Sequence, residues 1–280
     1  MIIFKTAAAL NSYIQKAKEQ GQSVGFVPTM GALHQGHLSL IRQSKINTAL
    51  TVCSIFVNPT QFNNPEDFKH YPINREKDIE LLIGQDCDVL FLPGLQEVYP
   101  VNHQKTQYDL GQIEVLLEGE HRPGHFQGVC EVVDRLLSIV SPDQLFMGQK
   151  DFQQCMVIER LLSFSGRSGK VQLNIGPTLR EADGLAMSSR NTRLNVDQRR
   201  AAVIISESLF KIKDLFGTTS IEELEASAMA ALINAGFAVD YVSISNPKTL
   251  MPVHDHEQPA IALIAASLGS IRLIDNMLLD

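Results

Sequence analysis

The ten residues Pro28-Thr29-Met30-Gly31-Ala32-Leu33-His34-Gln35-Gly36-His37 join two different patterns. The apolar run 23–27 before them predicts a buried strand, and the apolar spacing that begins at Leu38 predicts a helix. Two histidines three residues apart therefore lie where a strand passes into a helix. The glycines allow a tight turn, and the first turn of a helix attracts phosphate. The segment predicts a site for nucleotide phosphates at a strand end.

An isolated pair of histidines at this spacing is weak support for catalysis, because most histidines are structural or exposed. In this setting, however, His34 and His37 lie beside a predicted phosphate site. Imidazoles placed there stabilise the charge that develops on a reacting phosphoryl group. The strand, the glycines and the helix together favour the catalytic interpretation.

Strands alternate with helices through the first part of the chain. Further strands are predicted at 50–57, 88–93, 143–147 and 171–175. Helices are predicted at 5–20, 38–47, 75–85, 129–140 and 152–164, with a short one at 112–117. Such alternation predicts a parallel sheet with helices on both faces.

Three polar segments follow predicted strands of this sheet. They are the segment 28–37, which we call the histidine turn, the loop 58–65 and the turn Gly148-Gln149-Lys150-Asp151. Ligands of parallel sheets bind outside the carboxyl ends of the strands. We therefore expect the three segments to meet at one site.

The composition changes after Gly176-Pro177. A polar strand and loop are expected at 180–191, helices at 196–216 and 221–235, strands at 237–245 and 261–266, and a last apolar stretch at 271–279. The pattern predicts a smaller α+β domain at 177–280 beside an α/β domain at 1–176.

The composition narrows the class of protein. The chain has 280 residues, 44% of them hydrophobic, and a formal net charge of −7, which argues against nucleic-acid or anionic-membrane partners. The four cysteines form no C-x-x-C pair, which indicates reduced thiols. No signal-peptide pattern opens the chain, and the apolar run 259–269 is too short to span a bilayer. We expect a cytoplasmic protein.

Several familiar motifs are absent or unsuitable. The sequence has no G-x-G-x-x-G after its first strand and no P-loop. The spacing of His121 and His125 suits zinc on a helix, but Pro123 and Gly124 between them disfavour that helix. The segment His254-Asp255-His256 lies in a polar stretch, which favours a solvated loop. We expect no fixed protein ligands for a metal.

Met187-Ser188-Ser189-Arg190 is a second candidate phosphate site. Two hydroxyls and a guanidinium in one short loop can hold phosphate oxygens. The alternative is a surface loop before a helix capped by Asn195, and the spacing does not separate the two. Lys150 is likewise either a phosphate ligand or an ordinary exposed lysine.

Four segments together resemble the pantothenate synthetase (pantoate–β-alanine ligase) family, which belongs to the nucleotidyltransferase superfamily with its H-x-G-H signature. The segments are 28–37, 54–62, 148–154 and 184–191. They occur in the order of the family and lie within a chain of the expected length. The resemblance implies a Rossmann-like first domain, with the smaller second domain closing over ATP.

The resemblance also implies a two-step ligation and a set of site residues. ATP and pantoate would form pantoyl adenylate and pyrophosphate with the help of Mg²⁺, and β-alanine would then displace AMP. Catalytic roles fall on His34, His37 and Lys150. Contacts with ATP fall on Met30, Gly31, Ala32, Leu33, His34, Gln35, Gly36, His37, Gly148, Gln149, Lys150, Asp151, Leu179, Met187, Ser188, Ser189 and Arg190. Contacts with pantoate or β-alanine fall on Gln61, Gln154 and Asn58.

The family further implies a homodimer, and the sequence departs from its pattern in two places. Ile73-Asn74 replaces the usual Arg-Thr pair, with Arg75 as a partial substitute, and the segment 127–131 also differs. Two other functions remain open: a different H-x-G-H nucleotidyltransferase, and a catalytically silent nucleotide-binding protein.

Overall fold

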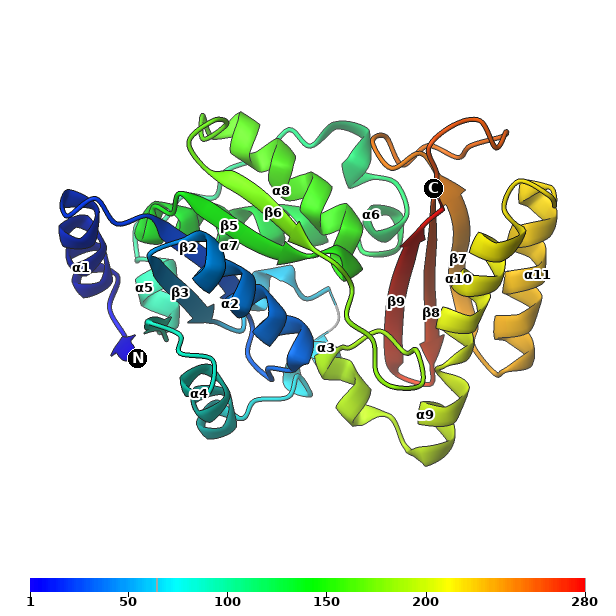
Figure 1. The fold of residues 1–280 in the computed structure, drawn as a ribbon, viewed down its shortest axis with the longest axis horizontal. Helices are drawn as coiled ribbons and strands as arrows, with labels where there is room; N and C mark the ends of the chain where they lie inside the picture. The colour runs from blue at the N-terminus through cyan, green and yellow to red at the C-terminus, as the bar shows by residue number, and fades with distance from the viewer. Residues whose placement is uncertain (64, 280) are drawn as a thin grey trace.

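A computed structural model describes residues 1–63 and 65–279 of the protein. Asn64, which belongs to the predicted loop 58–65, lies outside the described residues. Within the described ranges, six parallel strands form one sheet and three antiparallel strands form another (Figure 1). The predicted fold class, a parallel α/β unit with a smaller α+β unit, is confirmed. The boundary at 176/177 stays a prediction.

The parallel sheet has the order β1-β4-β3-β2-β5-β6. Its strands are β1 (Ile2–Phe4), β2 (Val24–Thr29), β3 (Leu50–Ile55), β4 (Val89–Phe91), β5 (Gln144–Gly148) and β6 (Gln172–Gly176). In register, Phe26 of β2 lies between Val52 of β3 and Leu145 of β5. The strand order reverses beside β2, and such a switch point opens a crevice at the carboxyl ends of the strands. The histidine turn begins at that crevice.

Successive strand residues face opposite sides of the sheet, so two cores form. Phe26, Val52 and Leu145 pack under α1 (Ala7–Glu19), α7 (His125–Val140) and α8 (Phe152–Phe164). Val27 and Phe146 pack under α2 (Gln35–Asn47) and α4 (Arg75–Ile83). Burial on both faces explains why these strands are continuous apolar runs.

The second unit is a three-stranded sheet covered on one side by helices. Its strands are β7 (Ala238–Ser245), β8 (Ile261–Leu268) and β9 (Ile271–Leu278). α10 (Ile204–Leu215) and α11 (Ile221–Asn234) pack on it through a core that includes Leu209, Leu232 and Ile264 (Figure 1). The single helix predicted at 196–216 is wrong. The chain forms α9 (Val196–Ala201) and then α10, because a tight turn, with Ile205 N–H donating to Ala202 O, interrupts the helix.

In the first unit, the parallel-sheet part of the chain, the bounds of two helices also differ from those predicted from the sequence. α7 begins at His125 rather than at 129, since Gly124 adopts φ 77° and lets the helix start abruptly. The helix predicted at 112–117 is wrong: the 3₁₀ turn η2 (Gly111–Glu114) and α6 (Glu118–His121) flank a break at Leu117, whose φ is 47°. The structure adds β1 and the short elements η1 (Pro59–Gln61), α3 (Pro65–Lys69), α5 (Leu95–Val98), η3 (Gln149–Asp151) and η4 (Ser189–Arg193).

All four cysteines are buried and free. None of the helices in the described ranges is both long and apolar enough to cross a membrane.

Candidate active site

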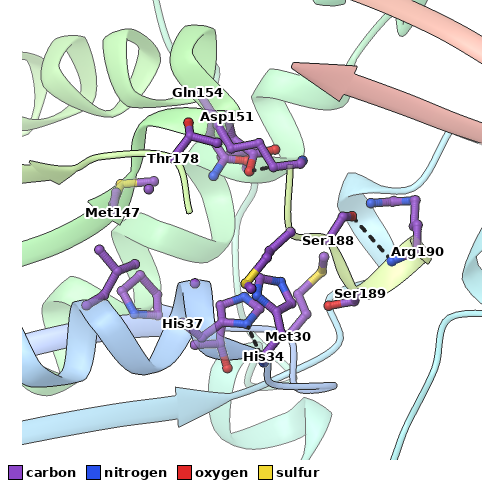
Figure 2. A pocket seen from close by; sticks show the side chains of 18 of the residues that line it. Met30, His34, His37, Met147, Asp151, Gln154, Thr178, Ser188, Ser189 and Arg190 are labelled. Atoms are coloured by element: carbon purple, nitrogen blue, oxygen red, sulfur yellow. Dashed lines mark hydrogen bonds and ion pairs between the residues drawn. The ribbon is translucent and has the colours of Figure 1, made fainter. Parts of the chain in front are cut away.

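A cleft lies at the carboxyl edge of the parallel sheet, where segments after β2, β3, β5 and β6 meet the loop before η4 (Figure 2). The convergence expected from the sequence is therefore present. Predicted site residues that line the cleft are Met30, His34, Gly36, His37, Gln61, Gly148, Lys150, Asp151, Gln154, Leu179, Met187, Ser188, Ser189 and Arg190.

The remaining predicted residues lie beside the cleft and do not line it. They are Gly31, Ala32, Leu33, Gln35, Asn58 and Gln149. Leu33 packs in the core under α2, and Asn58 is 1% exposed. The side chain of Gln149 donates to Asn276 Oδ1 (3.3 Å) instead. The contacts with ATP expected of the other five residues, and the contact of Asn58 with pantoate or β-alanine, stay predictions.

His37 is fixed as a neutral hydrogen-bond donor. Its Nδ1 accepts the backbone N–H of His34 (3.3 Å), so in the neutral ring the proton lies on Nε2. Burial, together with the positive charge of Lys150, lowers the pKa of His37 to about 4. The imidazole is therefore uncharged at neutral pH.

His34 lies against His37, with ring centroids 4.0 Å apart (Figure 2). Burial, then His37 and Lys150, lower its pKa to about 2. Its Nδ1 is buried and has no hydrogen-bond partner among the described residues. Both histidines thus lie neutral in the cleft, close to the cation of Lys150.

The carboxylate of Asp78 stabilises the histidine turn by accepting two of its backbone N–H groups. Its two oxygens accept the backbone N–H groups of Ala32 (2.9 Å) and Leu33 (2.7 Å). Asp78 is 2% exposed and comes from α4. Ala32 has φ 49°, a conformation unfavourable for a residue with a side chain, which these two bonds help to maintain. Sequence reasoning missed Asp78, since nothing local links α4 to the turn.

The loop of Ser188, Ser189 and Arg190 is docked on the histidine turn. Ser189 Oγ donates to the carbonyl oxygen of Ala32 (3.0 Å), across the two units. Arg190 pairs with Asp67 of α3 (2.7 Å), and so does Arg193 (2.7 Å). Asn195 caps α9, as the surface-loop alternative expected, but the segment before it lines the cleft. Its role in holding phosphate stays a prediction. The loop is part of the cleft, not a free surface.

Lys150 is held in place by the second unit. The side chain of Asn276 on β9 donates to the carbonyl oxygens of Gln149 (3.0 Å) and Lys150 (2.8 Å). The Lys150 side chain is 17% exposed, with its ammonium 3.8 Å from the Asp151 carboxylate. It is therefore not an ordinary exposed lysine.

The far wall of the cleft combines an apolar helix face with two amides. Val129, Val132, Val133 and Leu136 of α7 line it, together with Gln61 and Gln154. Gln61 Nε2 lies 2.9 Å from the sulfur of Met30. The wall suits a small branched molecule that carries oxygen acceptors.

Comparison with known proteins decides the family. The family model for pantoate-beta-alanine ligase matches residues 2–278. The chain belongs to the pantoate–β-alanine ligase family. It is 41% identical to the pantothenate synthetase of Pelotomaculum thermopropionicum, over 100% of this chain and 99% of that one, and 39% identical to that of Fervidobacterium nodosum, over 100% of both.

Solved structures of the ligase family have the same fold. Pantothenate synthetase from Thermus thermophilus superposes with a TM-score of 0.93 at 38% identity, covering 99% of both chains. Pantoate-beta-alanine ligase from Francisella tularensis, solved as a complex with beta-gamma ATP and beta-alanine, gives 0.83 at 37% identity, covering 99% of this chain and 97% of that one.

The other sequence candidates do not line this cleft. His121 ends α6 and His125 begins α7, so one helix does not carry both; His125 Nδ1 instead lies 2.7 Å from Gln61 O. The segment 254–256 is a loop, and the described residues contain no group of three or more metal-ligating side chains. Arg75 is exposed and does not line the cleft, and its partial substitution for the family's arginine stays a prediction.

Proposed function

We propose that this cleft is the active site at which the chain joins pantoate to β-alanine. ATP-dependent condensation of these two molecules is the activity of the family to which the chain belongs. One observation carries the proposal. The two histidines of the histidine turn share a cleft with Ser188, Ser189 and Arg190, and the side-chain amides of Gln61 and Gln154 line the same cleft.

In the first step the carboxylate of pantoate attacks the α-phosphorus of ATP, and pyrophosphate leaves. Negative charge grows on the phosphate oxygens in the transition state. The Nε2–H of neutral His37 and the ammonium of Lys150 donate to those oxygens, with His34 beside them. Because burial and hydrogen bonds hold these groups in advance, their reorganisation costs little during the reaction.

Ser188, Ser189 and Arg190 hold the β- and γ-phosphates. For this the Ser189 hydroxyl turns from the carbonyl of Ala32, to which it donates in the structure, to a phosphate oxygen. Hydroxyls and a guanidinium suit anionic oxygens, and so do the imidazoles and ammonium opposite. This donor set does not suit a cation, so Mg²⁺ is expected to arrive on the phosphates of ATP. There it would neutralise part of their charge.

The adenosine end lies along β5 and the segment after β6. Asp151, partly exposed at the cleft, has a carboxylate suited to ribose hydroxyls, and Gly148 and Leu179 complete that side. Met30 closes the mouth of the site. The backbone of the histidine turn, from Gly31 to Gly36, with Gln149 and Met187, supplies the other expected contacts.

Pantoate lies on the far wall. Its two methyl groups fit the apolar face of α7, and Gln61 and Gln154 orient its oxygens. Neutral amides orient a carboxylate without pairing it with a cation that would reduce its nucleophilicity. Catalysis then depends mainly on placing the carboxylate in line with the α-phosphorus.

In the second step the amine of β-alanine attacks the acyl carbon of pantoyl adenylate, the amide bond forms, and AMP leaves. The substrates themselves supply both nucleophiles, so no covalent enzyme intermediate is needed. The Francisella relative, solved with β-alanine and an ATP compound, supports a shared site for the two.

A homodimer, a cytoplasmic location and two alternative functions were also predicted from the sequence. The homodimer follows from the family resemblance, and the cytoplasmic location follows from the composition. A different H-x-G-H nucleotidyltransferase would need a cationic pocket for a phosphorylated acceptor where this chain has Gln61 and Gln154. A silent nucleotide-binding protein would have little use for the complete set of phosphate donors.

The proposal is tested with purified protein, ATP, Mg²⁺ and pantoate, with and without β-alanine. We expect pantoate-dependent exchange of pyrophosphate into ATP without β-alanine, and sustained AMP release only with both substrates. AMP released with neither substrate, or no reaction from folded protein, would contradict the proposal. A phosphorylated acceptor in place of pantoate tests the rival nucleotidyltransferase.

A further inference from the structure

Asn58 lies behind the cleft, although it belongs to the turn that serves pantoate. It is 1% exposed and does not line the cleft, whereas Gln61 in the same turn does. Any influence of Asn58 on the reaction therefore passes through its neighbours.

The side-chain amide of Asn58 is held in one orientation. Its Oδ1 accepts the hydroxyl hydrogen of Tyr99 (3.0 Å), and its Nδ2 donates to the backbone carbonyl of Gly128 (3.2 Å). A carbonyl oxygen only accepts, so a flipped amide would bring two acceptors together at Gly128. The carbonyl of Gly128 and the backbone N–H of Thr60, which donates to Asn58 Oδ1 (3.4 Å), determine which end of the amide faces which neighbour. The Tyr99 hydroxyl adds a further bond at the Oδ1 end and helps to hold the amide in this orientation.

This orientation passes to Gln61. Asn58 Nδ2 also donates to Gln61 Oε1 (3.4 Å). A flipped Gln61 would place N–H against N–H, so its Nε2 must face away from Asn58. There it lies 2.9 Å from the sulfur of Met30, at the cleft wall. Gln61 therefore presents hydrogen-bond donors to a ligand.

Tyr99 is itself firmly placed and stays protonated. It follows α5, and its ring lies 6.2 Å from that of Phe56 and 5.2 Å from that of His103. His103 Nε2 in turn lies 2.9 Å from the buried Glu131 carboxylate. Burial raises the pKa of Tyr99 to about 12, so its hydroxyl hydrogen remains available at neutral pH.

We propose that Tyr99 is a positioning residue which, through Asn58, makes Gln61 a fixed hydrogen-bond donor to an acceptor oxygen of pantoate. The inference rests on the proposed function, because it assigns the ligand of Gln61. We call the hydrogen bonds from Tyr99 to Asn58 and from Asn58 to Gln61 the relay. The inference predicts that weakening the relay lowers the affinity for pantoate and leaves ATP binding unchanged. A purely structural role for Tyr99 would not separate the two substrates.

The first test is Tyr99→Phe, with Tyr108→Phe as the matched control. Tyr108 is also buried, and its hydroxyl donates to Asp134 (3.0 Å), away from the cleft. We expect Tyr99→Phe to raise the KM for pantoate about five- to tenfold, the usual effect of one hydrogen bond, with the KM for ATP unchanged. The control should change neither constant. Equal behaviour of the two variants would overturn the inference.

A double-mutant cycle tests the path through Gln61. In a Gln61→Ala background, adding Tyr99→Phe should change the KM for pantoate by less than about twofold, since the relay has lost its end. An undiminished effect of Tyr99→Phe there would show that the relay does not pass through Gln61.

Gln61→Glu tests the donor assignment without altering Tyr99. A glutamate still accepts from Asn58 but offers only acceptors to the cleft. Its KM for pantoate should exceed that of Gln61→Ala, and wild-type affinity would overturn the assignment. Absence of pantoate-dependent pyrophosphate exchange in the wild-type protein would instead overturn the proposed function.

Discussion

The neutral, fixed imidazole of His37 is the residue-level property on which the proposed adenylation depends. A histidine at its ordinary pKa near 6.5 would titrate within the physiological range. Here burial and Lys150 lower the pKa of His37 to about 4, and the backbone of His34 holds its Nδ1. The ring therefore offers one N–H in one direction throughout neutral pH.

His37→Ala removes this donor. We expect the rate of pantoate-dependent pyrophosphate exchange to fall by about two orders of magnitude or more, as when a donor that stabilises transition-state charge is lost. His254→Ala, in an exposed loop, is the control and should retain full activity. Near-normal turnover of His37→Ala would remove this residue from the mechanism.

The close approach of α7 to η1 shapes the pantoate wall at the level of elements. A Cβ on Gly128 would lie 2.3 Å from the carbonyl oxygen of Thr60 and 2.9 Å from Gln61 Cα. The same glycine accepts the Asn58 amide through its carbonyl. Glycine is therefore required here because backbone packs directly on backbone.

Gly128→Ala should separate α7 from η1. Alanine favours a helix over glycine by about 1 kcal/mol, but the clash with backbone cannot be relieved by a rotamer. We expect the free energy of unfolding to fall by about 1–3 kcal/mol and the KM for pantoate to rise at least about tenfold. Denaturant titration and steady-state kinetics measure both.

Gly94→Ala is the matched control, because a Cβ there meets nothing within 4 Å. Its stability should stay within about 0.5 kcal/mol of wild type. An unchanged KM for pantoate in Gly128→Ala would show that the approach of α7 does not position the turn.

On the scale of the whole molecule, contacts between the two units assemble the cleft. Arg272 of β9 forms a two-pronged ion pair with the buried Glu118 of α6 (both 2.7 Å), while Asn276 of the same strand holds the Lys150 turn. Ser189 completes the contact at the histidine turn. The last strand, β9, thus positions the turn of Lys150, to which we assign a catalytic role.

Acid should destabilise the whole molecule because neutral histidines are buried in the cleft and beside it. The pKa is lowered to about 2 in His34, about 4 in His37 and about 3 in His125. Below pH 6.5 the unfolded chain binds protons that the folded chain does not, so stability falls with pH; above 6.5 both states are neutral and the effect vanishes. For His125 alone the loss at pH 5 is about 2 kcal/mol.

Denaturant titrations between pH 6.5 and 5 measure this loss, in a range above the ordinary pKa of carboxylates. We expect the free energy of unfolding to decrease steadily as the pH falls. In His37→Ala the slope should be shallower by up to about 1.4 kcal/mol per pH unit, one proton's contribution. A stability independent of pH over this range would contradict the buried neutral state.

Local patterns were enough to predict the layered architecture and the position of the cleft. Phe26 and Val27 belong to an apolar run because both faces of β2 are buried, and such runs alternate with helical spacing along the chain. Strand ends in a parallel sheet share an edge, so polar segments after β2, β3 and β5 had to meet. Element ends were less predictable: the start of α7 depends on the backbone of Gly124, and the break after α9 on a single tight turn.

What the amino-acid sequence alone determined, then, is the α/β class, the family resemblance and the histidine, lysine and serine segments that form the cleft. Only the tertiary structure decided that Asp78 supports the histidine turn, that Asn58 lies behind Gln61, and that Tyr99 reaches it. It also decided which nitrogen of His37 carries the proton. The reason is physical: periodicity and turns are set by neighbours in sequence, whereas hydrogen-bond partners and burial are set by residues that only folding brings together.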